Sequence, residues 1–143
     1  MKHKWRKFSQ NEIEAVKKVI LSGKVNYLTG EVGKKFESEY ADWCGTKYAI
    51  ALANGTVALE IALKAIQIKK GDEVVVTSRS FIASVSCVIN AGGIPKFADV
   101  DANSGNITAA TIEKVISPKT KAVICVHLGG LPCEMDEIKK LSQ

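Results

Sequence analysis

The sequence predicts an α/β fold in which a mostly parallel sheet carries helices on both faces. Short apolar runs alternate with segments of helical spacing from about residue 46 to the end of the chain. The run from Glu73 to Thr77 has three consecutive valines at its centre, and such a β-branched run is typical of a parallel strand buried on both faces. Small and polar residues separate each apolar run from the helix expected after it, as strand-to-helix turns require.

The composition is that of a globular chain with room for one domain. Hydrophobic residues make up 46% and charged residues 24% of the 143 residues. The net charge is +5, but the only basic cluster is at the start of the chain, at Lys2, Lys4, Arg6 and Lys7. Because no nucleic-acid motif accompanies this basic end, we expect no nucleic-acid partner.

The sequence favours a cytoplasmic protein. No apolar run at the start has signal-peptide length, and none approaches the roughly 18 residues of a membrane span. The four cysteines form no CxxC pair, which suits reduced thiols. We therefore expect a cytoplasmic location and no membrane partner.

Two helices are expected ahead of the first strand. A capping box that begins at Ser9 opens an apolar repeat of helical spacing, which predicts a helix from about residue 9 to residue 22. After a loop, a second repeat predicts a helix over residues 33–43, and Gly45 offers its end.

The stretch from Tyr48 to Ile66 is read as a short apolar strand, a polar turn and an apolar helix. Asn54 suits the N-cap, Gly55 lets an anion approach the backbone, and Thr56 adds a hydroxyl. The first turn of a helix has N–H groups without intrahelical partners and a partial positive charge. This turn is therefore a candidate phosphate site, the alternative being an ordinary turn with a structural cap. It is not a Walker A loop, because no lysine follows the glycine.

Three more strand-and-helix units complete the expected order. We expect strands at residues 73–77, 94–98 and 121–127. The helices that follow them are expected at about residues 81–91, after an N-cap at Thr108, and from Met135 onward. Ligands of parallel sheets bind beyond the carboxyl ends of the strands. The candidate ligand-binding turns are therefore residues 54–56, 78–81 and 127–133.

Two other side-chain groups are possible sites. Asp99 and Asp101 could share one face as an acid/base pair, but solvated aspartates are common at strand ends. Cys125, His127 and Cys133 lack the spacing and the fourth ligand of a structural zinc site. We expect no metal site.

Several segments, in order, resemble the DegT/DnrJ/StrS-type sugar aminotransferases, which are pyridoxal-phosphate enzymes of the aspartate-aminotransferase fold (fold type I). The segments are LTGEVGKKFESEYADWCGTKYAIALANGTVALEIALKAI, GDEVVVTSRSFIASVSCVINAGGIPKFADVD and ISPKTKAVICVHLGGLPCEMDEI. The resemblance runs from about Gly23 to Leu141. It implies the N-terminal part of the large domain, so that residues 1–45 form a helical segment and residues 46–143 the βα units of a single partial domain.

The resemblance also implies the site residues. It assigns Gly55 and Thr56 to the phosphate of pyridoxal phosphate, in agreement with the anion-site argument. Phe81 falls where the family stacks an aromatic ring on the pyridine of the cofactor. The alternative for Phe81 is a plain core residue at a helix start. Thr29 lies in a loop that the family places near the substrate, so we expect it to bind substrate.

The implied activity is transfer of an amino group, from glutamate, to a keto-deoxysugar nucleotide. The family's Schiff-base lysine and the carboxylate for the pyridine nitrogen fall beyond this chain, which is therefore expected to be truncated before them. We assign no catalytic residue, because no lysine stands in a matching context, including Lys119, Lys121, Lys139 and Lys140. The alternative is a non-catalytic fragment that binds phosphate or a partner. The family implies a homodimer, and unpaired apolar faces would favour self-association of the fragment.

Overall fold

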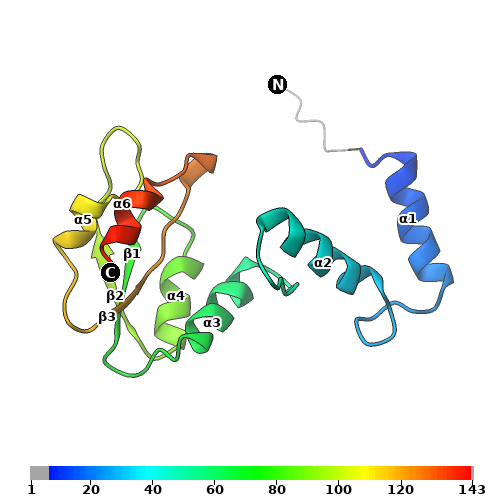
Figure 1. Cartoon of the computed structure of the whole chain (residues 1–143), viewed down its shortest axis with the longest axis horizontal. Helices are drawn as coiled ribbons and strands as arrows, with labels where there is room; N and C mark the ends of the chain where they lie inside the picture. The colour runs from blue at the N-terminus through cyan, green and yellow to red at the C-terminus, as the bar shows by residue number, and fades with distance from the viewer. Residues whose placement is uncertain (1–6, 143) are drawn as a thin grey trace. The chain divides into compact units, whose positions relative to one another are not determined.

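The computed structural model describes residues 7–142, and the chain divides into two compact units after Ala51 (Figure 1). Lys2, Lys4 and Arg6 of the basic cluster lie outside the described residues. Within residues 7–142, no helix has both the length and the apolar character needed to cross a membrane.

The first unit contains α1 (Gln10–Leu21) and α2 (Val32–Cys44). The expected capping box is confirmed, since Ser9 Oγ accepts the Glu12 amide at 3.3 Å and Ser9 N donates to Glu12 Oε2 at 2.7 Å. Gly45 ends α2 in the left-handed conformation, with φ of 65°, which a residue with a Cβ rarely adopts. Both helices therefore form where local signals predicted them.

The prediction of a strand at the start of the Tyr48–Ile66 stretch is wrong. Residues 48–52 have no regular secondary structure, and the large apolar side chains there are exposed. A strand needs a neighbouring strand to complete its hydrogen-bond ladder, and none among the described residues pairs with this segment. The Ala51 amide instead donates to a side chain, Glu37 Oε1, at 2.8 Å. Among the described residues there are thus three strands rather than the four expected.

The three strands form one parallel sheet. They are β1 (Glu73–Thr77), β2 (Ile94–Ala98) and β3 (Thr120–Val123), in the order β2-β1-β3. The bounds of β1 and β2 are those predicted. The expected fourth strand, residues 121–127, is shortened to β3: Ile124 N still donates to Val75 O at 2.8 Å, and the chain then leaves the sheet.

The helices of the second unit connect and cover these strands. They are α3 (Gly55–Ala65), α4 (Ala83–Asn90), α5 (Ala109–Glu113), the 3₁₀ turn η1 (Leu128–Gly130) and α6 (Met135–Lys140). The predicted caps are confirmed: Asn54 Oδ1 accepts from the Val57 amide at 3.0 Å, and Thr108 forms a capping box with Thr111.

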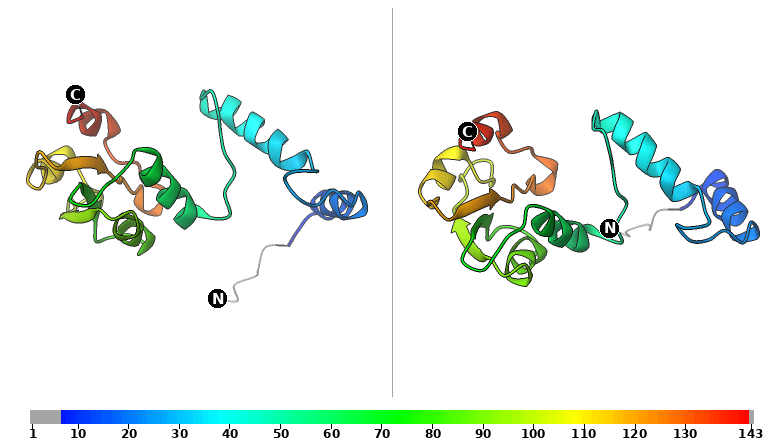
Figure 2. Two further views of the ribbon diagram at one scale, coloured as in Figure 1. Left: turned by 90° about the horizontal axis from the view of Figure 1, so that it is seen from below. Right: turned by 60° about the horizontal axis from the view of Figure 1, so that its bottom comes forward.

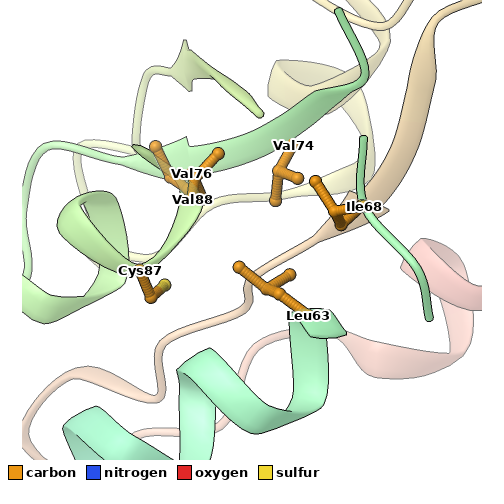
Figure 3. Packing of buried hydrophobic residues seen from close by; sticks show 6 residues of the cluster. All are labelled: Leu63, Ile68, Val74, Val76, Cys87 and Val88. Carbon is orange, nitrogen blue, oxygen red and sulfur yellow. The ribbon is translucent and has the colours of Figure 1, made fainter. Parts of the chain in front are cut away.

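Both faces of the sheet are buried beneath helices. Val74 and Val76 pack with Leu63 of α3 and with Cys87 and Val88 of α4 (Figure 3). Because successive side chains of a strand point to opposite faces, Val75 packs in the other direction. Figure 2 shows α5 and α6 on the opposite side of the sheet from α3 and α4. Its cluster contains Ala98, Ile107, Ile112, Cys133 and Ile138. The predicted α/β architecture with helices on both faces is confirmed.

Candidate functional site

An open pocket lies where the amino ends of α3 and α4 come together. Its volume is about 590 Å³, and it is lined by Gly55, Thr56, Ala58, Leu59, Phe81, Ala83 and Ser84. Two of the three predicted turns, residues 54–56 and 78–81, therefore contribute to one pocket. The fold brings together Gly55, Thr56 and Phe81, which are far apart in the sequence.

The start of α3 presents two free amides to this region. The next two amides of the helix are both bonded to Asn54. The Asn54 side chain accepts from Val57 N at 3.0 Å, and the Asn54 carbonyl accepts from Ala58 N at 3.1 Å. Within the part of the chain that the structure describes, the amides of Gly55 and Thr56 have no hydrogen-bond partner. Such amides, at the positive end of the helix dipole, are suited to bind an anion.

Gly55 leaves room for that anion. A Cβ added at Gly55 would meet no atom within 4 Å, so it would project into open space rather than into the protein. Any side chain at this position would stand where an anion must approach the amides. The residues present therefore fit a phosphate-sized group at the α3 amino end.

Phe81 is not a core residue, so that alternative is wrong. Its side chain is 73% exposed, and it lines the pocket next to the start of α4. No aromatic pair within the described residues includes its ring. The ring is therefore available to stack on a flat group in the pocket.

Ser84 is a pocket residue that the sequence analysis did not identify. It is 6% exposed, and its Oγ lies 2.7 Å from Ser80 Oγ. The helix expected at about residues 81–91 would place Ser84 on the same face as Phe81, three residues earlier, although in the structure Phe81 precedes α4.

Thr29 lies in the other unit. Its amide and its hydroxyl both donate to Asn26 Oδ1, at 3.1 and 3.2 Å, and its side chain is exposed. The hydroxyl oxygen keeps its capacity to accept a hydrogen bond. The binding of substrate by Thr29 stays a prediction.

The third predicted turn, residues 127–133, does not line this pocket. It is held by Asn106, a buried residue whose amide group donates to Leu131 O at 2.8 Å and accepts from Leu128 N at 3.2 Å. His127 Nδ1 accepts from Cys133 N at 3.0 Å. Among residues 7–142, no three His, Cys, Asp or Glu side chains are grouped so that they could hold a metal ion.

The two strand-end aspartates are engaged in local turns. Asp101 Oδ2 accepts from the amides of Ser104 and Asn103 at 2.8 and 3.0 Å, and these bonds lower the pKa of Asp101. Asp99 Oδ1 accepts from the Val100 amide at 2.8 Å. Burial raises the pKa of the thiols of Cys87, Cys125 and Cys133, which favours their neutral form.

Comparison with known proteins shows which proteins this chain resembles. GDP-perosamine synthase of Escherichia coli O157:H7 is 42% identical over 123 residues, which are 86% of this chain and 32% of that protein. The X-ray structure of an aminotransferase from Psychrobacter cryohalolentis has a TM-score of 0.94 and 52% identity, and covers 97% of this chain and 35% of that one. NtdA of Bacillus subtilis, solved with its cofactor PMP bound, has a TM-score of 0.85 and 30% identity over 94% of this chain and 32% of that one.

The chain therefore spans about a third of the length of these relatives. Its fold matches the N-terminal part of the fold type I aminotransferases, which use pyridoxal phosphate. The sequence profile of the DegT/DnrJ/EryC1/StrS aminotransferase family matches residues 6–143, which is nearly the whole chain. The chain belongs to the DegT/DnrJ/EryC1/StrS aminotransferase family.

Proposed function

We propose that this chain forms the phosphate-binding and ring-stacking part of a pyridoxal-phosphate-dependent aminotransferase. The proposed reaction moves an amino group from glutamate to a keto-deoxysugar nucleotide. The observation that carries the proposal is the shared pocket, which is lined by the two residues with free amides and by an exposed aromatic residue. The relatives named above, a GDP-perosamine synthase and a PMP-bound protein, support the substrate class and the cofactor.

Each pocket residue has a distinct task in this proposal. The amides of Gly55 and Thr56 bind the phosphate group, and the Thr56 hydroxyl adds a third donor. Phe81 stacks on the ring, sets its tilt and excludes water from one face. When bound, pyridoxal phosphate supplies the aldehyde that carries the amino group and the ring that withdraws electrons. We place the lysine and the carboxylate that complete this chemistry outside these 143 residues.

Phe81→Ala is expected to weaken pyridoxal phosphate binding about tenfold, because an aromatic stacking contact contributes about 0.5–1.5 kcal/mol beyond buried area. Thermal unfolding should change little, since Phe81 is exposed. The measurement is an absorbance titration with pyridoxal phosphate. Ile82→Ala is the matched control, because Ile82 is a neighbouring exposed residue that does not line the pocket. Equal weakening in both variants would contradict the assignment of Phe81.

We also propose that the chain self-associates, as part of a homodimer in the whole protein. No residue of α1 is buried, and Trp43 of α2 is 80% exposed with its ring 5.5 Å from that of Tyr40. Contiguous exposed apolar side chains mark surfaces that pack against another protein, and a second copy is the occupant that the family favours.

Sedimentation velocity is expected to show a weight-average mass that rises with protein concentration. Trp43→Ala should shift this rise to higher concentration, because a large exposed aromatic residue is a typical interface anchor. Lys47→Ala, a nearby change that removes no large apolar surface, is the control. A monomer at every concentration would refute self-association.

A further inference from the structure

We propose that Glu37 is a positioning residue whose carboxylate fixes the loop carrying Thr29 to α2 and to the segment ending at Ala51. The importance of this loop for substrate rests on the function proposed above. The holding role of Glu37 rests only on the contacts of the residue 7–51 unit.

The carboxylate of Glu37 joins three segments. Its Oε2 accepts the Tyr27 hydroxyl at 2.8 Å, and its Oε1 accepts the Ala51 amide at 2.8 Å. The two partners lie ten residues before and fourteen residues after Glu37 in the sequence. Both carboxylate oxygens are thus used by different parts of the chain, as a clamp requires.

Two other carboxylates, one in α2 and one at its N-cap, make only local pairs. Glu39 meets Lys35 at 3.5 Å, one helical turn away, and Glu31 at the helix start meets Lys34 at 3.1 Å. Exposed pairs of this kind contribute little to stability. Glu37 therefore differs from them in the range of its contacts.

The loop that Glu37 holds is folded tightly on itself. Asn26 Oδ1 accepts from the amides of Leu28 and Thr29, at 3.0 and 3.1 Å, and Gly30 N donates to Asn26 O at 2.8 Å. A Cβ at Gly30 would lie 2.8 Å from Asn26 O, so the backbone approaches itself too closely for a side chain there. Residues 26–30 consequently form one compact piece that includes Tyr27 and Thr29.

The Tyr27 ring also lies against the first turn of α2. A Cβ added at Gly33 would be 3.2 Å from Tyr27 Cδ2, which shows how closely the ring packs there. The unit offers little apolar packing as an alternative support, because Ala41 is its only buried hydrophobic residue within the described range. The position of the loop therefore depends on hydrogen bonds rather than on a core.

The charges of the two side chains agree with this arrangement. The Ala51 amide, and then the Tyr27 hydroxyl, lower the pKa of Glu37, and the bond to Glu37 raises the pKa of Tyr27. The bonded forms are thus ionised Glu37 and neutral Tyr27. The contribution of Glu37 to stability is present above its unfolded pKa and is lost as pH falls through its lowered folded pKa. That of Tyr27 is present below its unfolded pKa and is lost as pH rises through its raised folded pKa.

The test compares Glu37→Ala with Glu39→Ala, a change of the same size on the same helix. Amide exchange followed by NMR should show Ala51 N–H exchanging about tenfold faster in Glu37→Ala, since a hydrogen bond to a charged group is lost. Ultraviolet titration, with Tyr27→Phe to identify the signal, should show the Tyr27 pKa falling toward its ordinary value. Glu39→Ala should change neither quantity.

Glu37→Gln tests whether Glu37 acts through its hydrogen bonds or through its negative charge alone. The carboxamide oxygen can still accept from Ala51 N, and its NH₂ can donate to the Tyr27 oxygen. We expect Ala51 protection within about twofold of the parent chain but a lowered Tyr27 pKa. Unchanged exchange in Glu37→Ala, or the same acceleration in Glu39→Ala, would overturn the proposal. Both readouts are taken without cofactor, so they decide the role of Glu37 whether or not pyridoxal phosphate binds.

Discussion

Gly55→Val is expected to weaken pyridoxal phosphate binding about 100-fold, because the new side chain would occupy the approach to two charge-assisted hydrogen bonds. The folded chain should tolerate the change. Nothing lies within 4 Å of the added Cβ, and Gly55 does not adopt a left-handed φ. The loss should therefore appear in binding rather than in stability.

The measurement is a titration with pyridoxal phosphate, with circular dichroism as the check of helical content. Ala62→Val is the matched control, since Ala62 is an exposed residue of the same helix and does not line the pocket. Gly55→Ala should be intermediate, because one methyl group fills less of the opening. Binding by Gly55→Val equal to that of Ala62→Val would exclude the α3 amides as the phosphate site.

Ile112→Ala is expected to lower the free energy of unfolding by about 2–5 kcal/mol. Ile112 is 0% exposed and packs with Val75 of β1, Ile107 and Ile138, in the cluster on the α5 and α6 side of the sheet. Truncation would leave a cavity that close-packed neighbours can fill only in part. Since whole domains are stable by only about 5–15 kcal/mol, this loss is a large share of the total.

Denaturant unfolding measures this change, and Ile116→Ala provides its control. Ile116 follows α5 one helical turn after Ile112 but is 40% exposed, so the same chemical truncation removes less buried surface. Ile116→Ala should lower the free energy of unfolding by less than half as much as Ile112→Ala, in proportion to the apolar area lost from the interior. Equal losses of unfolding free energy in the two variants would show that the cluster on the α5 and α6 side of the sheet does not depend on Ile112.

Local signals predicted most of the elements. The capping box at Ser9, the cap at Asn54 and the stop at Gly45 lie where the sequence analysis placed them, because each depends on atoms only a few residues apart. The strand β1 was also predicted with its bounds, since a β-branched run between turns has few other folded states.

The predictions of strands were wrong where a strand depends on a partner that is distant in the sequence. The apolar segment at residues 48–52 has the composition of a strand but pairs with no strand among the described residues. The third strand was predicted too long, because the loop held by Asn106 takes the chain away from the sheet. Amino-acid composition alone does not indicate whether a distant strand pairs with residues 48–52, or that Asn106 binds the loop after β3.

The sequence by itself determined the caps, the buried character of β1, the candidate residues Gly55, Thr56 and Phe81, and the resemblance to a family. These depend on local hydrogen bonding and on side-chain type, both of which can be read along the chain. Only the tertiary structure decided that Phe81 is exposed beside the free amides of α3, and that Glu37 reaches both Tyr27 and Ala51. The reason is that these contacts join segments far apart in sequence, and packing and hydrogen bonding in three dimensions decide which of them meet.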